Sequence, residues 1–231
     1  MPYLYIDPWY IILVVPAMLL AFWAQINVNT TFSRYSKVLA PSGMTGAESA
    51  HRVLEANGVT GVRIERISGN LTDHFDPKTN TIRLSESVYD ATTVSAVGVA
   101  AHEAGHAVQY AVGYAPMQLR AAIIPATNIG SQLAMPLVLL GLIFSSAMLV
   151  DIGIIAFSMS TLFQLITLPV EFNASRRAVA TLESSCVSDT EVKGAKAVLR
   201  AAALTYVAAL AVSLASLLRI ILLFGNRNRR D

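Results

Sequence analysis

The segment VAAHEAGHAVQ, residues 99–109, carries two histidines four residues apart, with a glutamate directly after the first. A chance match to this His-Glu-x-x-His pattern is expected roughly 0.002 times in a chain of this composition. On an α-helix, His102 and His106 lie about 40° apart around the axis, so both imidazoles can bind one metal ion. Glu103 points to the side, where it can hold a metal-bound water and act as general base. The segment therefore indicates a hydrolytic zinc site.

A catalytic zinc site has three protein ligands and one position open for water. The metzincin pattern is excluded, because Gln109 and Val112 stand where that pattern has glycine and histidine. Glu171, in LPVEFNASRRAVATLE, is the first charged residue after a long apolar stretch, and a helical pattern begins there. We therefore expect Glu171 to be the third ligand. The alternative is a carboxylate at a helix N-terminus that interacts only with the helix dipole.

The histidines share one face only if their segment is helical. Small and apolar residues at helical spacing, without an interrupting proline, predict a helix over residues 90–113. Asp90 and the threonine pair that follows it are residue types that cap helix N-termini. Gly98 and Gly105 lower helix propensity, but they allow another element to pack closely against this helix.

The composition is that of a membrane protein. The chain is 54% hydrophobic and 14% charged, whereas about a quarter of the residues in a typical soluble domain are charged. Four charge-poor stretches have about the length that a bilayer span needs. They are residues 9–28, 121–150, 152–170 and 201–218, the last continuing past Arg219 to Phe224. We expect a multi-pass protein of the cell membrane with about four transmembrane helices in the lipid bilayer.

Several other classes of protein are excluded. The net charge of +2 is too small to indicate a nucleic-acid partner. The single cysteine, Cys186, can form neither an internal disulfide nor a cysteine-based metal site. The first apolar stretch follows Asp7 and lacks a basic region before it, so we expect an uncleaved anchor and not a signal peptide.

A polar region between the first two apolar stretches has α+β character. In PSGMTGAESAHRVLEANGV, Thr45 and Glu48 have the spacing of a capping box, and Asn57-Gly58 is typical of a helix end. GVRIERI and NTIRLS alternate as strands do, and SGNLTDHFDPKT between them is rich in turn residues. We divide the chain into five regions. They are an N-terminal membrane anchor (1–28), a catalytic region (29–120), a transmembrane hairpin (121–170), a third-ligand helical segment (171–200) and a C-terminal transmembrane helix with a basic tail (201–231).

The second and third apolar stretches are separated only by Asp151 and its neighbours, with Gly153 close by. They must therefore form a tight hairpin. Arg120 then enters the membrane and Glu171 leaves it on the same side, while Asp151 lies at the opposite face. A third ligand can thus come from far along the chain.

The segments AAHEAGHAVQ and VEFNASRRA, with LTDHFDPKTNTIRLS before and ALTYVAALAVSLASLLRIILL after, resemble the YugP-type neutral zinc metallopeptidases of bacterial membranes. The likeness runs over nearly the whole chain. More distantly, the layout resembles the HtpX and CAAX-prenyl membrane metalloproteases. The resemblance implies a zincin-like, gluzincin-like site with one Zn²⁺ per chain, His102, His106 and Glu171 as ligands, and Glu103 as base.

One position departs from the distant relatives. They have an aspartate four residues after the ligand glutamate, where it accepts a hydrogen bond from a ligand histidine, whereas this chain has Ser175. Ser175 can still accept such a bond but carries no charge, and Asn173 is an alternative.

Three further residues have a functional and a simpler interpretation. His74 could line a substrate cleft or donate to the oxyanion, or it could be an ordinary loop histidine. Tyr206 could donate to a tetrahedral intermediate, or it could be an interfacial aromatic. Arg177, like its neighbour Arg176, could bind a substrate carboxylate or the oxyanion, or it could extend towards lipid headgroups.

These residues predict a membrane-embedded zinc endopeptidase that acts on a peptide or protein substrate. One alternative is a membrane scaffold or quality-control adaptor with a structural or degenerate metal site; a fourth protein ligand would favour it. Another is a site-2-type intramembrane protease with Asp151 as ligand. The charges of Asp76, Lys78 and Arg83, just before the histidine helix, argue against that reading.

The distribution of basic residues predicts the orientation. Those near the membrane on the catalytic side are Arg34, Lys37, Arg120, Arg176, Arg177, Lys193, Lys196 and Arg200. They outnumber the arginines of the C-terminal tail, GNRNRRD. The positive-inside rule therefore predicts an active site on the cytoplasmic side.

Overall fold

The computed structural model describes residues 7–185 and 188–224. Cys186 and the basic tail lie outside these ranges. The chain forms two compact units. The first consists of Met1–Ala24, Leu119–Leu168 and Thr205–Asp231, and the second of Gln25–Gln118 and Pro169–Leu204.

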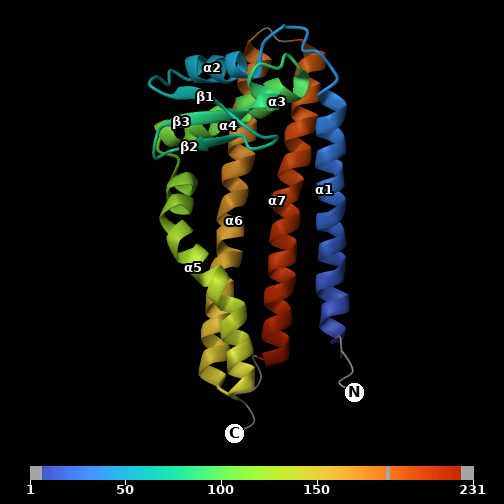
Figure 1. Cartoon of the computed structure of the whole chain (residues 1–231), viewed down its shortest axis with the longest axis vertical. Helices are drawn as coiled ribbons and strands as arrows, with labels where there is room; N and C mark the ends of the chain where they lie inside the picture. The colour runs from blue at the N-terminus through green and yellow to red at the C-terminus, as the bar shows by residue number, and fades with distance from the viewer. Residues whose placement is uncertain (1–6, 186–187, 225–231) are drawn as a thin grey trace. The chain divides into compact units, whose positions relative to one another are not determined.

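The second unit contains the short helices and the sheet. Its elements between the long helices are α2 (Gly46–Ala56), β1 (Arg63–Ile67), β2 (His74–Asp76), β3 (Thr81–Ser85), α3 (Glu86–Tyr89) and α4 (Val94–Ala111). The strand order is β1-β3-β2, with β3 parallel to β1 and antiparallel to β2 (Figure 1). The mainly helical fold with a small α+β region is therefore as predicted.

Strands β1 and β3 confirm the alternating patterns, but β2 was not predicted. The segment between them is rich in turn residues, and it also contains this short strand. His74–Asp76 pair with Thr81–Arg83 because Phe75 is buried and Asp76 closes the turn that follows. The Asp76 carboxylate accepts from Lys78 N at 3.0 Å and from Thr79 Oγ1 at 2.8 Å.

Helix α2 confirms the predicted capping box. Glu48 N donates to Thr45 Oγ1 at 3.2 Å, and Thr45 N donates to Glu48 Oε2 at 2.8 Å. The hydrogen bonds that the Glu48 carboxylate accepts from the Thr45 backbone N–H and from the Thr45 hydroxyl hold the pKa of Glu48 below its usual value. The helix ends at the predicted Asn57-Gly58, where Gly58 has a φ of 65° that favours glycine.

Helix α4 is shorter than the predicted helix over residues 90–113. It begins at Val94, because Glu86–Tyr89 form the separate helix α3 and Thr93 caps α4 by accepting from Ala96 N at 3.4 Å. Its two glycines lie at close approaches. A Cβ on Gly105 would come within 2.6 Å of Ala174 O, and one on Gly98 within 3.2 Å of Ala195. The backbones of two other helices therefore pack directly against α4.

The first unit is made of parts of four long apolar helices. These are η1 (Tyr10–Val14) with α1 (Val15–Tyr35), α5 (Ala115–Ile143), α6 (Ala147–Ser184) and α7 (Asp189–Phe224). In the described chain, each is long and apolar enough to cross a membrane, which agrees with the four predicted spans. The bidentate ion pair of Asp7 with Arg219, 2.6 Å for the Nη2–Oδ2 contact, joins the start of the first helix to α7.

The turn between α5 and α6 is not where the sequence predicted it. It lies at residues 144–146, and Asp151 lies inside α6. Ser145 takes the left-handed backbone position, with a φ of 51°. Gly153 is instead a contact residue: a Cβ there would lie 2.9 Å from Ala134 O. The glycine after Asp151 serves close helix packing and not chain reversal.

Candidate metal centre

Two histidines on α4 and one glutamate on α6 converge within the second unit. Glu171 Oε2 lies 3.2 Å from His102 Nε2 and 3.5 Å from His106 Nε2. One ligand atom of each residue lies within 4.8 Å of the others, and no second group of this kind is found in residues 7–185 and 188–224. In a tetrahedral zinc site with bonds of about 2.0–2.1 Å, ligand atoms stand about 3.3 Å apart. These three side chains therefore fit a zinc ion.

Glu171 lies far inside α6, which begins at Ala147. The alternative of a carboxylate at a helix N-terminus is therefore wrong. The helix continues unbroken through Pro169, so the apolar segment and the third-ligand segment form one helix. Glu171 is 2% exposed. A carboxylate this deeply buried is retained only with strong partners, which a metal or the two histidines supply.

The outer nitrogen of each histidine ring also has a partner. His102 Nδ1 lies 3.1 Å from Ser175 Oγ, and His106 Nδ1 lies 3.0 Å from Gln109 Oε1. With Nδ1 so engaged, Nε2 of each ring faces Glu171. Metal-binding histidines commonly have such a partner on the nitrogen that does not bind the metal.

Burial lowers the pKa of His106, but hydrogen bonding to Glu171 and the charges of Glu103 and Glu171 outweigh it, so the net shift is upward. Only neutral imidazole binds a metal. Protons therefore compete with the metal at this ligand.

Glu103 lies beside the ligand pair and contacts β2. Its Oε2 accepts a hydrogen bond from Phe75 N at 3.0 Å, and the Phe75 ring packs against Tyr110 with ring centroids 5.8 Å apart. A carboxylate held by a backbone donor stays oriented, as a general base must be. The unpredicted strand β2 thus supplies a contact that positions the predicted base.

The sequence did not identify Gln109 as part of the site. It served only to exclude the metzincin pattern, although its spacing of three residues after His106 places both on one helix face. Gln109 Nε2 donates to Val170 O at 2.7 Å and to Asn173 Oδ1 at 3.0 Å. Asn173, expected as an alternative partner of a histidine, contacts Gln109 and Arg177.

The remaining candidates lie as follows. His74 is exposed on β2, and its Nδ1 donates to Thr72 O at 2.8 Å. Arg177 Nε donates to Asn173 Oδ1 at 2.8 Å, whereas Arg176 is exposed. Tyr206 lies on α7 in the first unit. The roles predicted for His74, Tyr206 and Arg177 in transition-state binding stay predictions.

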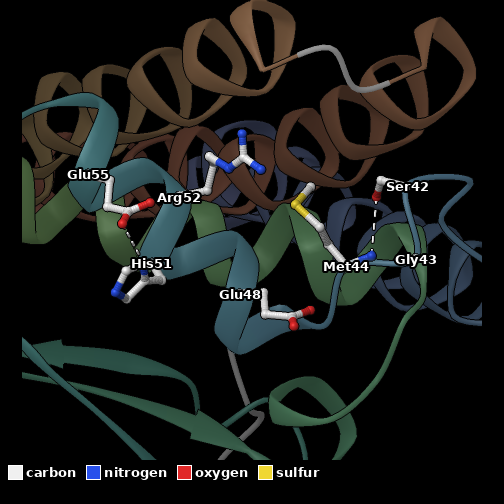
Figure 2. A pocket seen from close by; sticks show the side chains of 7 residues that line it. All are labelled: Ser42, Gly43, Met44, Glu48, His51, Arg52 and Glu55. Atoms are coloured by element: carbon white, nitrogen blue, oxygen red, sulfur yellow. Dashed lines mark hydrogen bonds and ion pairs between the residues drawn. The ribbon is translucent and has the colours of Figure 1, made fainter.

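A cavity of about 420 Å³ opens on α2 and the loop before it. Figure 2 shows that polar side chains surround it, with Met44 as the apolar member. Glu48 there belongs to the capping box, and His51 pairs with Glu55 at 3.4 Å. None of the metal-centre residues lines this cavity.

Comparison with known proteins identifies a family and a relative. Residues 10–225 match the family described as "Putative neutral zinc metallopeptidase". The "Putative membrane protease YugP" of Bacillus subtilis (strain 168) is 49% identical over 218 residues, which are 94% of this chain and 97% of that protein. No solved structure matches. Both matches extend over the helices of both units.

Proposed function

Because the chain belongs to the zinc metallopeptidase family that matches residues 10–225, we propose that it is a gluzincin-like endopeptidase of the membrane. The proposal rests above all on one observation: His102, His106 and Glu171 converge with the spacing of zinc ligands. Glu103, in the general-base position of the His-Glu-x-x-His motif, contacts the backbone beside them. The substrate of the proposed endopeptidase is a peptide or protein segment.

In this proposal His102, His106 and Glu171 hold one zinc ion. When bound, zinc supplies a Lewis acid that polarises the scissile carbonyl and acidifies the attacking water. The Glu103 carboxylate takes a proton from that water as the water oxygen bonds to the carbonyl carbon. Glu103 then delivers the proton to the leaving nitrogen as the C–N bond breaks. The Phe75 N–H holds Glu103 in place between the two transfers.

The number of ligands supports catalysis over a structural metal site. In the described chain the group contains three residues, which leaves one tetrahedral position for water. A structural zinc site is closed by four protein ligands. The group contains Glu171 and not Asp151, which speaks against the site-2-type alternative.

The test is Glu103→Gln in the detergent-purified full chain. We expect bound zinc to remain at the parent level and cleavage of an unfolded protein substrate to fall by at least about 10²-fold, because the amide cannot accept the proton. Glu55→Gln, an exposed carboxylate on α2, is the matched control and keeps the parent rate. Undiminished cleavage by the Glu103→Gln chain would rule out this base. A parent that binds zinc but cleaves nothing would favour the adaptor alternative.

A cytoplasmic active site is part of the same proposal. It is supported by the basic residues near the membrane ends of the catalytic segments, such as Arg34, Lys37 and Arg120.

A further inference from the structure

The two histidines differ in how their outer nitrogens are held. His102 Nδ1 faces the Ser175 hydroxyl, which can either donate or accept a hydrogen bond. His106 Nδ1 faces the side-chain amide of Gln109. This amide has an oxygen that accepts on one side and an NH₂ group that donates on the other. Gln109 is fully buried, at 0% exposed, so water does not compete for these positions. The amide orientation therefore decides which nitrogen of His106 carries the proton.

That orientation is fixed by its neighbours. The Val170 carbonyl can only accept, so the Gln109 NH₂ group must face it, at 2.7 Å. The Arg177 guanidinium can only donate, so Asn173 must turn Oδ1 towards it, at 2.8 Å. That same Oδ1 accepts the second N–H of Gln109 at 3.0 Å. Both N–H groups of Gln109 are thus used, and only Oε1 is left for His106.

Because Oε1 can only accept, His106 Nδ1 must be protonated. The neutral ring then has a bare Nε2, and this is the atom 3.5 Å from Glu171 Oε2. The opposite tautomer would place its proton between His106 and Glu171, where a metal must bind. We propose that Gln109, held by Val170, Asn173 and Arg177, is a positioning residue that fixes the metal-binding tautomer of His106. This inference rests on the proposed function, since it concerns the same zinc site.

The test compares Zn²⁺ affinity in detergent-purified full-length chains, by competition with a chelator of known affinity. Gln109→Met keeps the shape of the side chain but removes its hydrogen bonds, and we expect the affinity to fall about 10- to 100-fold. Gln109→Glu keeps an acceptor for Nδ1–H, and the proton of its neutral carboxyl group can replace the amide N–H that donates to Val170 O. We expect this variant to restore affinity close to that of the parent. Bound Co²⁺ gives a second readout, because its visible spectrum changes with coordination geometry; we expect the Gln109→Met spectrum to differ from the parent's.

Ser49→Ala is the matched control for a purely structural effect. Ser49 is also fully buried and donates to a carbonyl of α4, Val97 O, at 2.9 Å, and the described hydrogen bonds of its side chain include no histidine. We expect this variant to unfold at a lower temperature and to bind Zn²⁺ as the parent does. If Gln109→Met does not fold, Gln109→Asn replaces it, because its amide is one methylene too short to keep both partners. We expect the same fall in affinity.

The outcomes separate the two proposals. A parent chain that binds no Zn²⁺ overturns the proposed zinc site, and this inference with it. A parent that binds Zn²⁺ while Gln109→Met binds equally well overturns only the role of Gln109. So does an equal loss in Gln109→Glu and Gln109→Met, because acceptance of the Nδ1 proton would then not matter.

Discussion

At the scale of single residues, Ser175 is an uncharged partner of a ligand histidine at a position where the distant relatives have an aspartate. Its hydroxyl lies 3.1 Å from His102 Nδ1, where a carboxylate would add charge to the hydrogen bond. A neutral partner still orients the ring but brings no charge to the contact. His102 is therefore held by geometry more than by charge.

Ser175→Ala removes this partner. We expect Zn²⁺ affinity to fall about 10-fold, and Ser175→Asp to bind Zn²⁺ at least as tightly as the parent. Chelator competition on the purified chains measures both. Ser184→Ala is the control, since Ser184 lies on the same helix and bonds only to Thr181 O in the described contacts. Equal affinities in the parent and the Ser175→Ala chain would show that this contact does not support the ligand.

The sequence predicted that the three residues of the metal centre converge, but it did not predict all the side chains that form hydrogen bonds with them. His102 and His106 share a helix face by spacing alone, and the apolar stretches place Glu171 on the same side of the membrane. Gln109 was missed because its role depends on Val170 and Asn173, some sixty residues away. Such contacts are tertiary, and a local pattern carries no information about them.

At the scale of elements, the approach of α4 to α6 determines whether the ligands can meet. The two backbones touch at Gly105, where a Cβ would come within 2.6 Å of Ala174 O and 3.1 Å of its carbonyl carbon. A backbone atom cannot rotate away as a side chain can. A larger residue at 105 must therefore move the helix that carries the histidines away from the helix that carries Glu171.

Gly105→Ala tests this approach. We expect a loss of about 1–3 kcal/mol in the free energy of unfolding, from overpacking, together with less bound zinc per chain. Gly98→Ala is the matched control: its Cβ would lie 3.2 Å from Ala195, so the strain is smaller, and alanine is the better helix former by about 1 kcal/mol. Thermal unfolding and metal analysis of both variants give the result. A Gly105→Ala chain as stable and as rich in zinc as Gly98→Ala would contradict the account.

Thr45→Ala tests an element away from the metal. We expect about 1 kcal/mol of destabilisation, because Glu48 N loses its acceptor at the start of α2. Zinc content should not change, since α2 carries no ligand. Loss of zinc in this variant would mean that α2 supports the metal centre more directly than its contacts indicate.

The predicted elements differ from the observed ones where a helix cap, strand pairing or helix packing decides the structure and the local sequence pattern does not. The histidine helix was expected to start near residue 90, but Thr93 caps it after the separate helix α3. Strand β2 has only three residues, too few for a periodic pattern, and it forms because it pairs with β3. The hairpin turn was misplaced because Gly153 was taken as a turn residue, whereas it serves helix packing.

At the scale of the whole molecule, four apolar helices imply a defined orientation in the membrane. If α5 and α6 each cross once, the turn at residues 144–146 lies on the face opposite to their other ends. The basic residues predict that those other ends are cytoplasmic. Loop residues between β1 and β2 are then cytoplasmic too.

Cysteine labelling in whole cells tests the orientation. In a chain whose own cysteine is removed by Cys186→Ser, we expect Phe144→Cys, exposed at the turn, to react with a membrane-impermeant maleimide added outside. Asn70→Cys, exposed between β1 and β2, should react only after the cells are opened. The reverse pattern would place the metal centre outside the cytoplasm. It would leave the zinc chemistry untouched.

The zinc content of Glu171→Ala, beside that of the parent, tests the central claim most directly. Glu183→Ala is the control, because Glu183 lies on the same helix but is exposed and pairs only loosely with Lys196, at 3.9 Å. The account predicts one zinc per chain in the parent and in the control, and a clear loss in Glu171→Ala. A parent without zinc after purification free of chelators, or a Glu171→Ala chain with undiminished zinc, would contradict the three-ligand site and the hydrolysis built on it.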